Sequence, residues 1–253
     1  KKGKNPSFAL VNKIEELGCN YEIIFNKSNR TNIISKPKLF IDGKSYFKPE
    51  ISGKTPDINV YKLNNVSVIG STDAIIYNNK FLHHELNLME NWHDLKRWDI
   101  FTKIDAQCYE LNLKYDNKIL ASNKNKIYIS LLKEHSINYY HFMTEGLPRL
   151  IQIMESVEKF DISNYSLLID DEMPKQCIEA IKIVLNSDIE IIFIKKGEVF
   201  ICEELIYCTP LWTSLDNTTG LPNPKKEFFV DKYAINLVRE KILASFVPKV
   251  KTT

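Results

Sequence analysis

The chain carries two patterns of hydrophobic and polar positions, one in each half. In the first half, apolar residues recur mainly with the period of two that is typical of strands packed on one face. This pattern predicts strands at 21–25, 39–41, 60–61, 65–69, 73–77, 80–82 and 109–113. Asn78 and Asn79 lie between two of these segments and predict a tight hairpin turn. One helical stripe, which ends at Gly18, predicts a helix over 5–18.

From residue 125 onward, strand and helix patterns alternate. Apolar runs predict strands at 126–132, 166–169, 190–194, 199–201 and 204–207, and helical spacing predicts helices at 138–157, 174–185 and 225–244. Such alternation is typical of an α/β structure with a parallel sheet. Within the segment 190–194, Ile191 to Ile194 form a continuous apolar run, which indicates a strand that is covered on both faces. We therefore predict a Rossmann-like parallel sheet with helices on both faces, preceded by a β-rich segment.

These patterns divide the chain into four segments. Residues 1–57 begin with a short helix and a strand, and their polar remainder, which prolines and glycines interrupt, predicts a loop-rich elaboration. Residues 58–124 form the β-rich segment, with mixed helix and loop expected over 86–104. Residues 125–245 form the Rossmann-like domain, and residues 246–253 are interpreted as the start of an interdomain linker.

The helix predicted over 138–157 carries reactive side chains on one face. His141, Glu145 and Arg149 follow one another at intervals of four residues and therefore lie on the same side. Pro148 lacks an N–H group and predicts a bend near residues 146–148. An imidazole, a carboxylate and a guanidinium on one side of a bent helix suit the wall of a cleft. The apolar stripe on the other side consists of Phe142, Leu147, Leu150, Ile151, Met154 and Val157.

Spacing alone also admits a purely structural interpretation of this face. Glu145 and Arg149 can form an exposed ion pair that stabilises the helix by about 0.3–0.5 kcal/mol. His141 can be a core histidine that donates to a backbone carbonyl. Under that interpretation the protein is a non-catalytic α/β module that binds a carbohydrate or a protein.

Composition narrows the class of protein without choosing a function. The 253 residues suffice for one large domain or two modest ones, and 44% hydrophobic and 26% charged residues are ordinary for a globular protein. A formal net charge of +2 gives no argument for binding nucleic acid or a membrane surface. The five cysteines are odd in number and have no C-x-x-C spacing, which favours reduced thiols and a cytoplasmic location. No apolar run is long enough to span a bilayer.

Residues 138–150 resemble a known family signature. Asn138-Tyr-Tyr-His141, then Glu145, then Leu147-Pro-Arg-Leu150 are similar to the signature of glycosyltransferase family 61, and the resemblance covers roughly residues 58–245. That family includes bacterial capsule and lipopolysaccharide enzymes and eukaryotic xylosyl- and N-acetylglucosaminyltransferases. The resemblance implies the N-terminal, acceptor-side half of a GT-B-like enzyme. It also implies a second Rossmann-like domain with a His-Gly-Ala string near the donor nucleotide, and that string does not occur in these residues.

The same resemblance implies the reaction and its setting. We expect inverting transfer of a sugar from a nucleotide-sugar donor to a glycan or lipid-linked glycan acceptor, without a metal or other cofactor. Bacterial capsule or lipopolysaccharide synthesis in the cytoplasm, or at the cytoplasmic face of the inner membrane, is the implied setting. Peripheral membrane association is expected only through other parts of the full protein, and no nucleic-acid partner is expected.

Glycosyl transfer requires a base that removes the proton of the acceptor hydroxyl as this hydroxyl attacks the anomeric carbon. Glu145 can serve if partial desolvation raises its pKa, whereas the ordinary pKa of a histidine such as His141 is already near the working pH. The resemblance favours the acidic position, so we predict Glu145 as the base and His141 as a positioning residue. Arg149 is expected to fix Glu145 or to bind phosphate. Substrate-binding roles are predicted for Asn138, Tyr140, Arg149 and Trp212.

Three other groups of polar residues receive structural interpretations, and no metal site is predicted. The first contains metal-capable side chains but lacks the helical spacing of a zinc-protease motif, so a solvated loop is expected. The second follows a predicted strand and is interpreted as an acidic cluster at the start of the next helix. The third lies in a proline-rich loop at 209–224 and can bind a sugar or pack between domains. The groups are His83-His84-Glu85 with His93-Asp94, then Asp170-Asp171-Glu172, then Trp212, Asp216 and Asn217.

Overall fold

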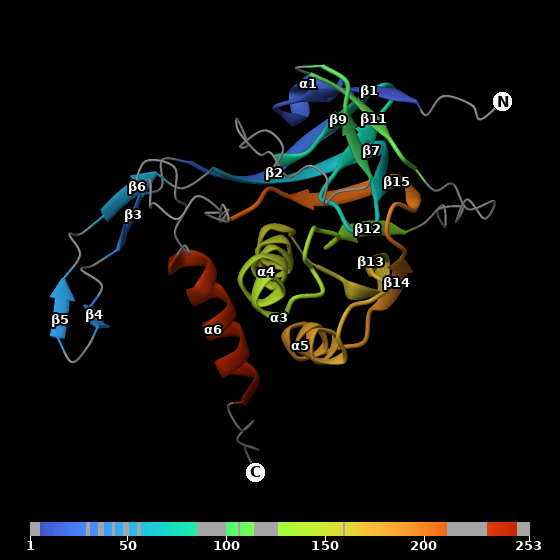
Figure 1. Cartoon of the computed structure of the whole chain (residues 1–253). Helices are drawn as coiled ribbons and strands as arrows, with labels where there is room; N and C mark the ends of the chain where they lie inside the picture. Colours follow the sequence, from blue (N-terminus) through green and yellow to red (C-terminus); the bar gives the residue numbers. More distant parts are fainter. Residues whose placement is uncertain are drawn as a thin grey trace, which may run out of the picture.

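The computed structural model describes residues 6–28, 31–34, 38–41, 44–47, 51–54, 57–84, 100–105, 107–113, 126–158, 160–211 and 232–246. Within these ranges the protein is an α/β structure built around one mixed sheet of 11 strands (Figure 1). The α/β class predicted from the sequence is therefore confirmed. The predictions for Trp212, for His93-Asp94, for most of 86–104 and for the linker at 246–253 lie outside the described residues or at their margin.

The strands have the following bounds: β1 (Ser7–Val11), β2 (Tyr21–Lys27), β3 (Thr31–Ile34), β4 (Lys38–Ile41), β5 (Lys44–Phe47), β6 (Ile51–Lys54), β7 (Ile58–Ile69), β8 (Ile75–Tyr77), β9 (Lys80–Leu82), β10 (Phe101–Lys103), β11 (Cys108–Leu111), β12 (Ile127–Ser130), β13 (Tyr165–Asp170), β14 (Glu190–Ile194) and β15 (Val199–Cys208). The helices are α1 (Ile14–Leu17), α3 (Tyr139–His141), α4 (Leu147–Ser156), α5 (Lys175–Leu185) and α6 (Lys232–Phe246). A π-helical turn (Phe142–Gly146) joins α3 to α4, and a 3-10 turn (Ile162–Asn164) precedes β13.

The sheet joins the two halves of the sequence. Its strand order is β10-β11-β1-β9-β8-β7-β15-β12-β13-β14, and β2 pairs with β7 outside this path. β12 pairs in parallel with β13 and β15, and β13 pairs in parallel with β14. β7 pairs antiparallel with β15 from Val60, which pairs with Cys208, to Ile69, which pairs with Val199. The segments 58–124 and 125–245 therefore share one hydrogen-bonded sheet.

Pairing between distant strands explains where the observed elements differ from the predicted ones. Residues 5–18 do not form one helix, because Ser7–Val11 is a strand between β9 and β11 and only one helical turn follows it. The strands predicted at 60–61 and 65–69 merge into β7, and those at 199–201 and 204–207 merge into β15. The stretch 26–57, expected to be loop-rich, contains the strand pairs β3–β6 and β4–β5, drawn away from the main sheet in Figure 1.

The helices α4, α5 and α6 cover one face of the parallel strands (Figure 1). Leu150 of α4, Ile181 of α5 and Leu237 of α6 share a single core with Ile129 and Leu167 of the sheet. The opposite face contributes to a second core, which the antiparallel strands and the single-turn α1 complete. The prediction of helices on both faces is therefore wrong for the long helices described, because the β-rich half folds back over the second face. Among the described residues, no helix is long and apolar enough to cross a bilayer.

Candidate functional site

The reactive face of the helix at 138–157 contains a local irregularity. The N–H group of Leu147 donates to the carbonyl of Phe142, five residues earlier, so the turn is wider than an α-helical turn. Pro148 has no N–H group to offer the carbonyl of Thr144, and we attribute the widened turn to this missing donor. The structure thus has a π-helical turn where the sequence predicted a bend. Such turns occur frequently at functional sites.

His141, Glu145 and Lys133 form a chain of close contacts across this turn. Nδ1 of His141 lies 2.6 Å from Oε1 of Glu145, and Nζ of Lys133 lies 2.5 Å from Oε2 of the same carboxylate. Lys133 follows β12, so the sheet end and the helix meet at Glu145. The side chains of Lys133 and Glu145 are 6% and 5% exposed, whereas that of His141 is 20% exposed. Of the three, the imidazole is therefore the group that solvent or a substrate reaches most easily.

Glu145 is an ionised carboxylate in this arrangement. Burial would raise its pKa, but the hydrogen bond with His141 and the charge of Lys133 outweigh burial, so the pKa is lowered. The raised pKa that Glu145 would need as a base is therefore not present, because His141 and Lys133 both stabilise the ionised form. An ionised carboxylate only accepts hydrogen bonds, so Nδ1 of His141 donates to Glu145. In the neutral imidazole, Nε2 then carries the lone pair.

Arg149 does not join this chain. Its side chain is buried, its Nε–H donates to the carbonyl of Cys208 at 2.9 Å, and its guanidinium lies 5.1 Å from the ring centre of Tyr207. The extra residue in the π-helical turn changes the helical register, so the interval from Glu145 to Arg149 no longer places them together. The structure therefore supports neither the exposed Glu145–Arg149 ion pair nor an orienting role of Arg149 toward Glu145.

The remaining predicted site residues have the following positions. The side chain of Asn138 accepts a hydrogen bond from the N–H group of Tyr140 and caps the helix, which is a structural use of its amide. Tyr140 is 52% exposed and packs edge-on against His141. Trp212 lies outside the described residues. Of these residues, Tyr140 therefore lies beside the predicted site.

Asp170 fixes the loop that carries Lys133. One carboxylate oxygen accepts from the N–H group of Ser71 at 2.5 Å, and the other accepts from the hydroxyl of Ser136 and from the N–H group of Lys133. Asp170 ends β13 and is buried, so the prediction that it belongs to an acidic cluster at the start of the next helix is wrong. Burial raises its pKa from 3.8 to about 6, although these hydrogen bonds act in the opposite direction.

A cavity of about 220 Å³ opens where these loops meet. Segments that follow β7, β12, β13 and β14 line it, which is the carboxyl edge where open α/β sheets bind ligands. Lys133 and Glu134 both contribute to its wall. His135 also lines it, and the ring of His135 lies 5.6 Å from that of His141. His141 is therefore next to the cavity, one ring away from its lining.

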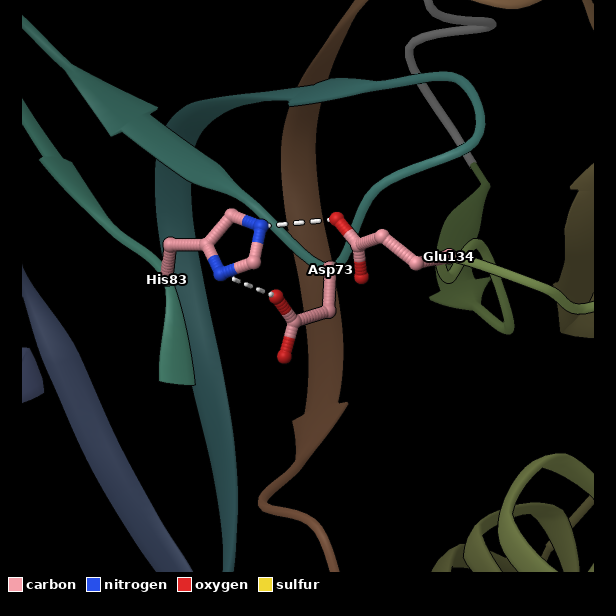
Figure 2. A group of neighbouring side chains, drawn as sticks. All are labelled: Asp73, His83 and Glu134. Carbon is pink, nitrogen blue, oxygen red and sulfur yellow. Dashed lines mark hydrogen bonds and ion pairs between the residues drawn. The ribbon is translucent and has the colours of Figure 1, made fainter. Parts of the chain in front are cut away.

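Behind the cavity lies a cluster that the sequence did not predict. Figure 2 shows His83 between two carboxylates, with Nε2 2.7 Å from Oε1 of Glu134 and Nδ1 3.2 Å from Oδ1 of Asp73. His83 and Asp73 are fully buried, so the prediction of a solvated loop is wrong for His83. The only signal in the sequence was that His83 directly follows an apolar strand. Its carboxylate partners lie 10 and 51 positions away in the chain, too far for a local motif.

Asp73, His83 and Glu134 are also the described residues that come closest to a metal-binding group. One ligand atom from each lies within 4.8 Å of the others. However, the two ring nitrogens of His83 face different carboxylates (Figure 2), and one ion can use only one of these nitrogens. The charges of His83, Lys133 and Arg149 outweigh the effect of burial and lower the pKa of Asp73. His84 adds no charge at neutral pH, because burial lowers its pKa to about 4. The arrangement thus fits a carboxylate–imidazole–carboxylate chain better than a metal centre.

The fold and site together define an α/β protein with a buried acid–base cluster beside a cavity at the carboxyl edge of its sheet. No protein-family model, no curated protein and no solved structure matches this chain. The residues of the site are therefore the basis for inferring the function.

The buried ion pair between Lys133 and Glu145 predicts a strong energetic coupling. Glu145→Gln leaves the ammonium of Lys133 buried without its carboxylate, and such a loss costs about 3–5 kcal/mol of unfolding free energy. Lys133→Met/Glu145→Gln removes both charges and should be destabilised by clearly less than the sum of the single variants, with a coupling of about 2–3 kcal/mol. Urea unfolding of the four proteins measures this coupling.

The exposed pair Lys62–Glu204 is the matched control, because its atoms lie 3.0 Å apart but its side chains are 30% and 39% exposed. The cycle with Lys62→Met and Glu204→Gln should give a coupling below about 1 kcal/mol. Equal couplings in the two cycles would contradict the interpretation of Lys133–Glu145 as a buried pair.

The raised pKa of Asp170 predicts a pH dependence of stability. Between the unfolded value of 3.8 and the folded value of about 6, the folded protein holds a proton that the unfolded chain has released. The contribution of Asp170 to the unfolding free energy is therefore largest at the acidic end of this window. It falls by about 3 kcal/mol as the pH rises through the window. Asp170→Asn removes this titration. From about pH 4 to pH 7, the unfolding free energy of the variant should therefore rise by about 3 kcal/mol relative to that of the wild type.

Unfolding free energies measured across this range test the prediction. Asp161→Asn serves as a control of opposite sign, because hydrogen bonds from Ser163 lower the pKa of Asp161. The contribution of Asp161 is present at neutral pH and is lost as the pH falls through its lowered pKa. A difference between Asp170→Asn and wild type that does not change with pH would overturn the assignment.

Proposed function

We propose that this chain is the acceptor-side part of a glycosyltransferase, in which His141 removes a proton from an acceptor hydroxyl. The observation that carries the proposal is the Lys133–Glu145–His141 chain beside the cavity. A buried, ionised carboxylate bonded to Nδ1 sets the tautomer of the imidazole and stabilises the imidazolium that forms when Nε2 accepts a proton. Lys133 in turn keeps Glu145 ionised and in place.

This proposal reverses the roles expected from the sequence. Both oxygens of Glu145 are engaged, by Lys133 and His141, and its lowered pKa makes it a weak proton acceptor. Nε2 of His141 carries a lone pair on a ring that is partly exposed. General bases work best when their pKa lies near the operating pH, which favours an imidazole over a strongly ionised carboxylate. We therefore assign the base to His141 and the positioning role to Glu145.

The resemblance of residues 138–150 to glycosyltransferase family 61 supplies the remaining parts of the proposal. They are a GT-B-like arrangement, a nucleotide-sugar donor, a glycan acceptor, inversion at the anomeric carbon, no metal, and a place in bacterial surface polysaccharide synthesis. In this scheme the described residues activate the acceptor hydroxyl, and a donor-binding domain elsewhere in the protein holds the nucleotide. The mixed sheet with a cavity at its carboxyl edge is compatible with this division.

His141→Asn tests the proposed base. The asparagine cannot accept the proton, so kcat for sugar transfer by the full-length protein should fall by about 10²–10⁴-fold, as is typical when a general base is lost. A screen of nucleotide-sugars for donor-dependent transfer identifies the substrate and measures the rate. The variant should keep the wild-type unfolding midpoint within a few degrees, because the ring of His141 is not in the core.

His135→Asn is the matched control, since its ring lies next to that of His141 and makes no hydrogen bond to Glu145. Asparagine also tolerates the positive φ of 59° at this position. This control should lose less than about tenfold in kcat, well short of the loss of a general base. Transfer by His141→Asn at the wild-type rate would exclude His141 as the base. Absence of transfer by the wild type with every nucleotide-sugar would argue for the non-catalytic binding module.

A further inference from the structure

The cavity at the carboxyl edge of the sheet has features that go beyond proton removal. We infer that it binds one sugar ring, one hydroxyl group of which donates to the carboxylate of Glu134. The inference rests on the proposed function only in taking the ligand to be a sugar, because the cavity and its carboxylate are independent of His141. Glu134 follows Lys133 in the chain, so the loop after β12 supplies one residue to the His141 chain and the next to this cavity.

Glu134 is held in place from behind. Its Oε1 is 2.7 Å from Nε2 of His83, and Nδ1 of His83 faces the buried carboxylate of Asp73 (Figure 2). The charge of His83, more than those of Lys133 and Arg149, outweighs burial and lowers the pKa of Asp73, so the ionised Asp73 and a protonated His83 stabilise each other. The hydrogen bond between Nε2 of His83 and Oε1 of Glu134 completes this chain. The carboxylate of Glu134 is thereby fixed, and binding a ligand does not require it to become ordered first.

The charges around the cavity favour a neutral ligand over an anionic one. Two lysines, Lys133 and Lys196, and two carboxylates, Glu134 and Glu172, line it, so the charges balance in number. In addition, the ammonium of Lys133 is bound to Glu145. A phosphate or diphosphate would require an excess of positive charge or a cluster of N–H donors aimed at one point. The described residues that line the cavity offer neither, so we assign the cavity to the uncharged part of a substrate.

Size and surface chemistry favour a single ring. The volume of about 220 Å³ is smaller than the roughly 300–1,000 Å³ of pockets that hold drug-sized ligands. One part of the lining is apolar and includes Ile100, Phe101 and Ile137, and another carries the hydroxyl groups of Ser71, Thr72 and Ser136. A pyranose presents C–H groups on its faces and hydroxyl groups around its edge, which matches this division. Phe101 also packs edge-on against His83, so the apolar wall and the carboxylate have a fixed relative position.

Ligand-detected saturation-transfer NMR with a panel of methyl pyranosides, including gluco, galacto, xylo and N-acetylglucosamine forms, tests the inference on the whole chain. At least one member should bind the wild type. Glu134→Gln should weaken this binding by at least about tenfold, because the ligand loses hydrogen bonds to a charged acceptor. Glu179→Gln is the control, since Glu179 is an exposed carboxylate of α5 that does not line the cavity, and sugar binding by this variant should change less than twofold.

A measurement on the wild type keeps the test valid if Glu134→Gln does not fold. The bound pyranoside should shift the ¹⁵N signals of the His83 ring. These signals are identified by their absence from the spectrum of His83→Asn. Failure of every pyranoside to bind, or binding without a change at His83, would overturn the inference. Stoichiometric Zn²⁺ binding that is lost in His83→Asn would overturn it as well, because the cluster would then be a metal site.

The outcome is separable from that of the proposed function. His141→Asn should bind the pyranoside as the wild type does, since His141 does not line the cavity. A protein that binds sugar but transfers none would therefore contradict the proposed function and leave the sugar site standing. Transfer activity that is unaffected by Glu134→Gln would contradict the sugar site alone.

Discussion

The arrangement of the site depends on one constraint, which is that a buried ammonium and a buried carboxylate must neutralise each other. The side chains of Lys133 and Glu145 are almost fully buried, and Nζ of Lys133 lies 2.5 Å from Oε2 of Glu145. Either group alone at this depth would be strongly disfavoured. The pair therefore ties the loop after β12 to the π-helical turn, and the carboxylate that results is the group to which His141 can bond. The position and the tautomer of His141 follow from this pairing.

A second carboxylate keeps the pair in position. Asp170, at the end of β13, receives hydrogen bonds from the turn after β7 and from both ends of the loop that begins at Lys133. Three segments distant in sequence thus meet at one buried acid, at the edge of the sheet where the cavity opens. In a similar way, His83 holds the carboxylate of Glu134 in place, and Asp73 contacts the other ring nitrogen of His83. The site is therefore built mainly from polar groups that the sheet topology brings together.

The sequence predicted those parts of the structure that depend on local pattern. The strands β12, β13 and β14, the helix α5 and the position of His141 opposite Glu145 follow from periodicity over a few residues. Contacts between distant segments could not be predicted in this way. Residues 7–11 have helical spacing but form a strand because β9 and β11 lie beside them, and Lys133 was not recognised because its partner is 12 residues ahead on another element. His83 gave no local signal, since its importance depends on Asp73 and Glu134.

The most direct test of this account is the protonation of His141, observed by ¹⁵N NMR of histidine-labelled protein and assigned with His141→Asn. At a pH at which the ¹⁵N signals show the ring to be neutral, the account predicts that Nδ1 carries the proton and Nε2 is unprotonated. It also predicts that Glu145→Gln removes this preference. A ring protonated at Nε2 with Nδ1 free, or a tautomer that Glu145→Gln leaves unchanged, would contradict the claim that the Lys133–Glu145 pair sets His141 as a base.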